Sequence, residues 1–124
     1  MTTQKNLTSK AILDNYFHKT AIRIYKEAFK ITLLEPIVDT DKYNRRSFIC
    51  VNRKHFNPMD YNINYHEHGY DGAACFIYYN GAWRFEIFNE DGKVNCGNIA
   101  NYYGGSGTER NATFAVEDIR TIFI

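Results

Sequence analysis

The side chains of this sequence that suit catalysis or ligand binding are those of a cysteine, a pair of histidines and a group of basic residues. Cys96 ends the stretch "FNEDGKVNC" and comes just before "NIANYY", which has the pattern of a short helix. At the N-terminus of a helix, the dipole and the free amides lower the pKa of a thiol. Cys96 is therefore the candidate for a reactive thiol.

His66 and His68 are the candidates for a metal site. They lie in "YNINYHEH", where apolar and polar residues alternate as they do along a strand with one wet face. Residues two apart on a strand project to the same face, as histidines that share a metal must. No further ligand has a telling spacing, and asparagines occupy the same face. A solvated strand face is thus the alternative, and we expect no bound cofactor.

The residues around Cys96 resemble the first cysteine motif of the diaminopimelate epimerase family. Residues 88–92, "FNEDG", and residues 96–98, "CGN", match the two halves of that motif, and residues 105–108 look like the glycine loop after the family's second cysteine. The resemblance implies that Cys96 moves a proton at the α-carbon of a substrate. That reaction needs an acid and a base on opposite faces of the substrate, but the second cysteine's position here is Gly104. Because no other histidine or cysteine lies nearby in sequence, we predict that Cys96 is not a catalytic nucleophile.

A basic stripe and two tyrosines are the candidates for contact with a partner. The stripe has spacings of four, three and four, which fall on one side of a helix, and consists of Lys19, Arg23, Lys26 and Lys30. It suits an acidic protein or a phosphate backbone, and a solvated helix face is the alternative. With 15 basic and 14 acidic residues the formal charge is +1, which favours a protein partner over a nucleic acid. Tyr102 and Tyr103 follow asparagine and precede glycines, a polar context in which exposed tyrosines act as interface residues.

Apolar periodicity predicts the element that presents the basic stripe. The pattern predicts a helix from a cap at Thr8 or Ser9 to about Lys30. Apolar residues recur in it every three or four positions, and they are Leu13, Phe17, Ala21, Ile24, Ala28 and Ile31. Strand-like patterns follow this helix. The first of them contains Pro36, which cannot donate to a sheet and so marks an edge or a break.

The hairpin around Asn80-Gly81 is the clearest strand signal. Such a pair fits a type I′ turn, which pairs Tyr78 with Trp83, Phe76 with Phe85 and Ala74 with Ile87 on an apolar core face. "NEDG" then turns the chain into a third strand through Val94. The sequence predicts an α+β fold, in which an N-terminal amphipathic helix packs on a mostly antiparallel sheet of about five strands, with residues 1–124 as a single domain.

Composition narrows the class of protein. The sequence has no apolar run long enough to span a membrane, and its first residues lack the apolar core of a signal peptide. Its three cysteines include no C-x-x-C pair, so we expect a reduced, cytoplasmic protein. The favoured hypothesis is a small non-enzymatic binding or inhibitor-type module that acts through a protein partner. The alternative is a small thiol- or metal-dependent enzyme centred on Cys96 or on His66 and His68.

Overall fold

The structure, a computed structural model, describes Lys19, Arg23 and residues 26–56 and 64–122. Within these ranges six strands form one sheet: β1 (Phe29–Pro36), β2 (Tyr43–Val51), β3 (Gly72–Tyr79), β4 (Ala82–Phe88), β5 (Ser106–Gly107) and β6 (Asn111–Val116). One α-helix, α2 (Cys96–Tyr102), follows β4, and two 3-10 helices lie in the connections, η3 (Tyr65–His68) and η4 (Ile119–Thr121). No helix in the described part of the chain is long and apolar enough to cross a membrane.

The sheet is mixed, with the strand order β1-β2-β3-β4-β6-β5. Every neighbouring pair is antiparallel except β2 and β3, which run parallel, so the chain crosses back between Val51 and Gly72. The predicted α+β fold with an N-terminal helix on a mostly antiparallel sheet of about five strands is therefore wrong. The sheet has six strands and one parallel pair, and the helix packed against it is α2, in the C-terminal half.

The sequence assigned the beginning of β1 to the wrong element. Ile31 fits the three-and-four spacing of the predicted helix, but Ile31, Leu33 and Glu35 are buried in alternation, which is the period of a strand. Lys30 therefore belongs to β1, while most of the predicted helix, residues 8–25 apart from Lys19 and Arg23, lies outside the described residues. Pro36 ends β1 at the edge of the sheet, as predicted.

The predicted hairpin is confirmed in position and register. Asn80 and Gly81 both have positive φ, 51° and 80°, and join β3 to β4 with Phe76 opposite Phe85. Towards the turn, however, this face leaves the core, because Tyr78 is 59% exposed and Trp83 is only half-buried. The predicted third strand through Val94 is wrong: α2 follows the loop after β4, and the second neighbour of β4 is β6.

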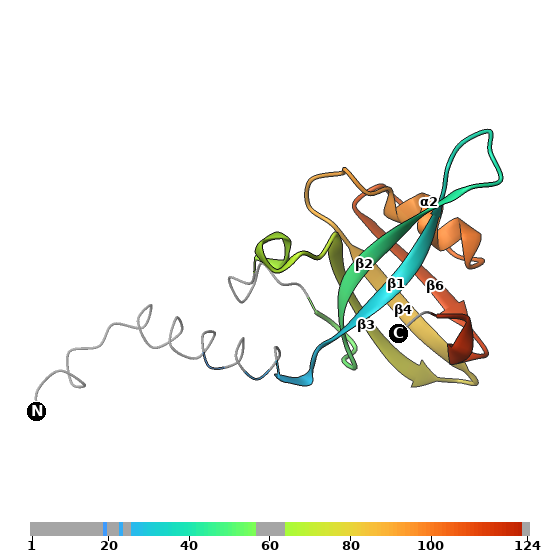
Figure 1. The fold of residues 1–124 in the computed structure, drawn as a ribbon. Coiled ribbons are helices and arrows are strands. Elements are labelled where there is room, and N and C mark those ends of the chain that lie inside the picture. Colours follow the sequence, from blue (N-terminus) through green and yellow to red (C-terminus); the bar gives the residue numbers. More distant parts are fainter. Residues whose placement is uncertain (1–18, 20–22, 24–25, 57–63, 123–124) are drawn as a thin grey trace, which may run out of the picture.

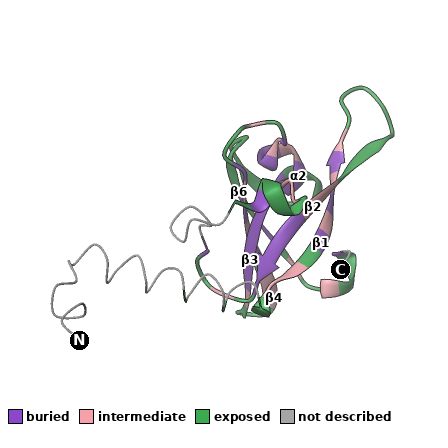
Figure 2. Cartoon of the chain, turned by 60° about the vertical axis from the view of Figure 1, so that its left-hand side comes forward, coloured by how far each residue is buried: buried purple, intermediate pink, exposed green. Residues whose placement is uncertain are grey.

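The main core lies between the sheet and α2. β1 and β2 cross in front of β3, β4 and β6, with α2 at one end of the sheet, where it contacts β1, β5 and β6 (Figure 1). Figure 2 shows buried residues along the inner parts of the strands and on one side of α2. Stacked rings of Phe76, Phe85, Phe114 and Tyr103 run through this core, with centroids 5.0–5.3 Å apart. Aromatic stacking thus joins the hairpin to the end of α2.

A second, smaller cluster lies on the opposite face of the sheet. Phe56 and Tyr65, from the crossover between β2 and β3, cover the outward side chains of both strands, including Ile49 and Cys75. Tyr65 belongs to η3 and is 1% exposed. This packing fixes η3 close to the start of β3, and it places His66 at the protein surface.

Candidate functional site

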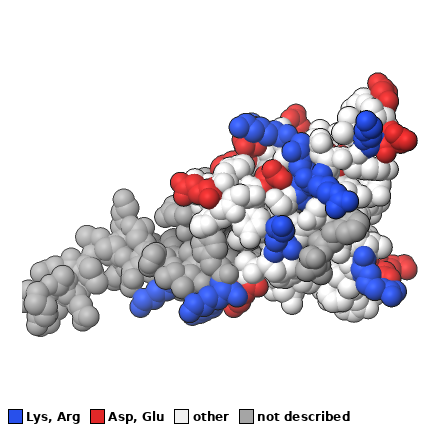
Figure 3. Space-filling model, viewed as in Figure 1, with Lys and Arg blue, Asp and Glu red and all other residues white. Residues whose placement is uncertain are grey.

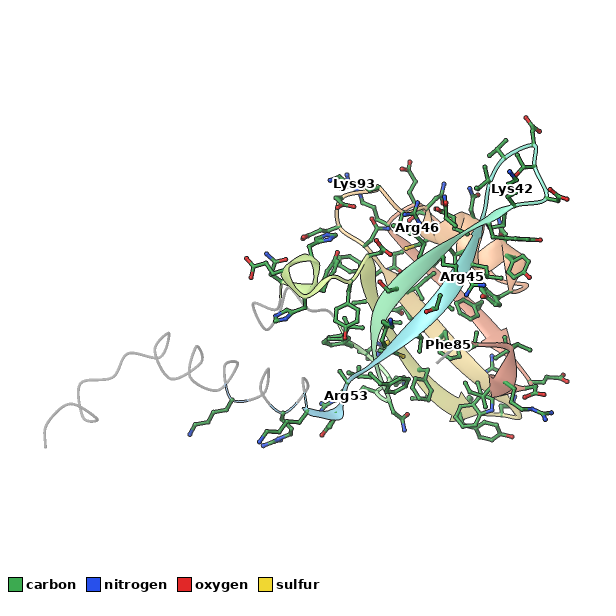
Figure 4. All side chains as sticks on the ribbon, viewed as in Figure 1. Lys42, Arg45, Arg46, Arg53, Phe85 and Lys93 are labelled. Atoms are coloured by element: carbon green, nitrogen blue, oxygen red, sulfur yellow. The ribbon has the colours of Figure 1, made fainter. Side chains whose placement is uncertain are left out.

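A polar pocket of about 340 Å³ opens where three separate parts of the chain meet. β2 contributes Arg46, the crossover before β3 contributes His66 of η3 and Asp71, and the loop after β4 contributes Asp91, Lys93 and Val94. The basic residues continue beyond the pocket: Figure 3 shows Lys and Arg side chains gathered over the face formed by β1 and β2, and Figure 4 labels Lys93, Arg46 and Arg45 there. The pocket therefore combines a histidine, carboxylates and cationic side chains.

His66 and Asp91 lie within ion-pairing distance of each other at the pocket. His66 Nε2 lies 3.2 Å from Asp91 Oδ2 and 4.0 Å from Glu90 Oε1. Because a carboxylate only accepts hydrogen bonds, a neutral His66 ring meets Asp91 favourably with its proton on Nε2 and its acceptor nitrogen at Nδ1. The two side chains are 38% and 29% exposed, so a solute can reach them. A histidine oriented by a carboxylate is the usual arrangement of a general base.

Tyr65 holds both partners of this pair in place. Its ring lies 4.4 Å from the ring of His66, and its hydroxyl oxygen accepts the Glu90 backbone N–H at 2.9 Å. Burial raises the pKa of Tyr65, so the hydroxyl stays protonated at neutral pH. One buried tyrosine therefore ties η3 to the loop that carries Asp91.

Asn89 shapes that loop from the inside. Its side chain is completely buried, and Nδ2 donates to Val94 O at 2.6 Å, Glu109 O at 2.9 Å and Cys96 Sγ at 3.1 Å. Its Oδ1 accepts the N–H of Gly92 at 2.8 Å, which closes the turn at Asp91. These contacts give the "FNEDG" stretch a structural role. The loop has no neighbouring strand to bond with, so the side chain of its asparagine forms the hydrogen bonds to the loop backbone instead.

Glu35 positions Arg46 at the pocket. Arg46 Nε and Nη2 both lie 2.9 Å from Glu35 Oε1, and Glu35 Oε2 accepts the Asn95 N–H at 2.7 Å. Glu35 is only 7% exposed, and a carboxylate at that depth needs such partners. Lys93 is exposed and has no such buried partner among the described contacts. The pocket thus has one cation held by a buried carboxylate and one exposed cation.

Cys96 lies at the first position of α2, so the short helix predicted after it is confirmed. The thiol is completely buried and accepts from Asn89, and burial raises its pKa despite the helix N-terminus. The expected lowering of the pKa is therefore wrong, because loss of solvent outweighs the helix dipole. The glycine loop forms β5, where Gly105 lies against the Thr113 carbonyl, and it brings no second base to Cys96.

His66 and His68 do not share a face as predicted. They lie on a 3-10 helix with three residues per turn, so side chains two apart diverge. His66 lines the pocket and His68 does not. Within the described ranges, no three His, Cys, Asp or Glu side chains are arranged to hold a metal ion.

The structure places the predicted partner-binding residues on different elements. Lys19, Arg23 and Lys26 are helical and exposed, whereas Lys30 lies on β1, so the predicted helical stripe does not include Lys30. Tyr102 is 45% exposed. Tyr103 is half-buried, and its hydroxyl accepts the Leu34 N–H at 3.1 Å.

Sequence analysis found His66 but missed its neighbours. Asp91 was assigned to a turn, and Arg46 was one basic residue among several. The available signal was the clustering of Asn, Asp and Gly in residues 89–92, which predicts a turn but not what the turn faces. The pairing of β3 with β4, in which Ala73 lies opposite Phe88, brings η3 close to the loop after β4, and the parallel pairing of β2 with β3 adds Arg46.

No protein family matches the chain, and no curated protein matches it in sequence. Among solved structures, it is similar to the pGpG-specific phosphodiesterase PggH from Vibrio cholerae, with 10% identity and a TM-score of 0.49. The match covers 86% of this chain but 35% of that chain, so this chain spans about a third of its length. The neighbour's name is that of an enzyme, so the comparison runs against the predicted non-enzymatic binding or inhibitor-type module, and that prediction is not kept. At this TM-score, the likeness assigns neither substrate nor mechanism.

Proposed function

We propose that the protein is a small enzyme that hydrolyses a phosphate ester, with His66 as the general base. The observation that supports this most directly is the 3.2 Å contact between His66 Nε2 and Asp91 Oδ2 in a pocket that also contains Arg46 and Lys93. Arginine and lysine are the side chains that hold phosphate oxygens. The proposal rests on these contacts alone.

In the proposed reaction, Arg46 and Lys93 bind the non-bridging oxygens of the phosphate group. A water oxygen attacks phosphorus while His66 Nδ1 accepts a proton from that water. The ester P–O bond breaks, its electron pair stays on the leaving oxygen, and that oxygen takes a proton from solvent. Asp91 stabilises the imidazolium formed at His66, as an orienting carboxylate does in other acid–base pairs.

Hydrolysis of bis(p-nitrophenyl) phosphate by the purified protein tests this role. His66→Gln keeps a polar side chain of similar size but removes the base, and we expect it to lower the rate by about a hundredfold or more. His68→Gln is the matched control, because His68 lies on the same 3-10 helix outside the pocket, and it should retain the rate. Equal rates for the two variants, with unchanged melting temperatures, would contradict the proposal.

Asp91→Asn separates orientation from charge. The amide keeps the shape of the side chain but loses the charge that stabilises the imidazolium, so the rate should fall while the fold persists. Wild-type activity in Asp91→Asn would exclude the pair as the catalytic unit.

A further inference from the structure

The cationic surface continues from the pocket along β2. Lys93 and Arg46 line the pocket, and the adjacent Arg45 leaves β2 on the other face of the strand, where Figure 4 labels it next to Arg46. Arg45 is fully on the surface, and it is paired across the sheet with Leu34 rather than with an acidic residue. Successive cations are therefore placed to bind a chain of phosphate groups that leads outward from the pocket.

Exposed aromatic rings stand at the far end of this surface. Tyr43 comes two residues before Arg45 on β2, so both side chains project to the same face of the strand. The rings of Tyr43 and Tyr102 meet edge-to-face at 5.2 Å, and each residue is 45% exposed. Tyr103 supports them, because its ring lies 4.9 Å from that of Tyr102 and its hydroxyl is anchored on β1.

From this arrangement we infer that the phosphate ester bound in the pocket belongs to a single-stranded nucleic acid. The inference rests on the proposed function and names its substrate class. Single strands are bound by cationic tracks that hold phosphates together with aromatic rings on which unpaired bases stack. The surface has both in order: Lys93, Arg46 and Arg45 for the backbone, then Tyr43 and Tyr102 for a base.

Two other occupants fit less well. An acidic polypeptide would use the cations but has no flat groups to stack on the tyrosines. A duplex keeps its bases stacked inside, so it presents phosphates to the cations and no base face to the rings. Asp39 and Asp41 lie at the tip of the β1–β2 hairpin. Their negative charge repels phosphate, so the cationic surface ends on that side.

Fluorescence anisotropy with labelled oligo-dT and oligo-U tests the surface, with a duplex of equal length and poly-glutamate as competitors. Tyr43→Ala should weaken binding of the single strands about tenfold or more, as loss of one stacking ring does. Tyr79→Ala is the matched control, since Tyr79 is 64% exposed but lies at the far hairpin, and it should bind as wild type. Arg45→Gln should reduce the slope of log affinity against log salt by about 0.7, the loss of one phosphate contact.

The outcomes separate this inference from the proposed function. His66→Gln should bind the oligonucleotide as wild type but no longer cleave it. Loss of small-ester hydrolysis in His66→Gln, with no oligonucleotide binding by the wild type, would overturn the substrate class and leave the proposed function standing. Equal affinity for duplex or for poly-glutamate would also overturn it. A third outcome would refute both the proposed function and the assignment of a substrate. In it, single strands bind in a way that depends on Tyr43, but no cleavage depends on His66.

Discussion

Replacing Asn89 with alanine tests whether the loop after β4 depends on one buried amide. The change leaves Val94 O, Glu109 O and the Gly92 N–H without their present partner; the bond to Val94 is buried and the other two are part-buried. Each buried group left unpaired costs about 1–3 kcal/mol, and neighbouring losses are not fully additive. We therefore expect Asn89→Ala to lower the free energy of unfolding by about 3–6 kcal/mol, a large part of the 5–15 kcal/mol typical of a domain.

Urea unfolding followed by tryptophan fluorescence measures this loss. Trp83 is the only tryptophan in the chain, and its ring lies 5.9 Å from Phe76 in the core. Asn101→Ala is the matched control, because Asn101 is exposed on α2 and its replacement should stay within about 0.5 kcal/mol. A loss below about 1 kcal/mol in Asn89→Ala would show that the loop keeps its shape without these bonds, contrary to our reasoning.

Asn89→Asp distinguishes lost hydrogen bonds from lost volume. Aspartate keeps the shape and the acceptor for Gly92, but it turns an acceptor towards Val94 O and Glu109 O, where the amide donated. The variant should be at least as unstable as Asn89→Ala. If it is as stable as wild type, the contribution of Asn89 is packing.

Three further predictions concern the sheet. Trp83→Ala should cost about 2 kcal/mol in urea unfolding followed by circular dichroism, less than a fully buried aromatic, because Trp83 is half-buried; a loss above about 4 kcal/mol would place the ring in the core. Gly105→Ala should abolish the soluble folded protein or lower its melting temperature sharply, since the added carbon overlaps the Thr113 carbonyl. Gly104→Ala is the control, because Gly104 has open space around it and the variant should show only the smaller strain of its φ of 89°. Equal melting temperatures of the two variants would disprove the overlap. Burial raises the pKa of Cys75 from 9.0 to about 11, so the folded state holds this proton more tightly than the unfolded state. The stability that results is present below pH 9 and is lost as the pH rises towards 11. Cys75→Ala should lose less stability over that range than the wild type, and an identical loss would contradict the raised pKa of Cys75.

The part of the fold that could be predicted is the part that is coded locally. Asn80 and Gly81 adopt positive φ because their own chemistry allows it, and the two-residue turn then fixes the register of β3 and β4 without help from distant residues. α2 is local too, since Asn95 Oδ1 accepts the Asn98 N–H and so caps the helix.

The rest depends on contacts between distant residues. The alternation in residues 61–68 fits a strand, yet Tyr65 and its neighbours form a 3-10 helix that ends at Gly69, whose φ is 82°. The burial of Tyr65 against β2 and β3 decides this, and no local pattern encodes it. The candidate site follows the same rule, because Arg46 joins His66 and Asp91 only after the parallel strands β2 and β3 have paired.

The bond from Leu34 to Tyr103 has a consequence for self-association. β1 is the outermost strand on its side, and an open strand edge can add a strand from another molecule and so begin aggregation. Along this edge the Leu34 N–H is already taken by the tyrosine hydroxyl, Pro36 has no N–H to offer, and Lys30 adds a charge. β5 at the opposite edge is only two residues long. Both borders of the sheet are therefore poor templates for the addition of a strand from another molecule.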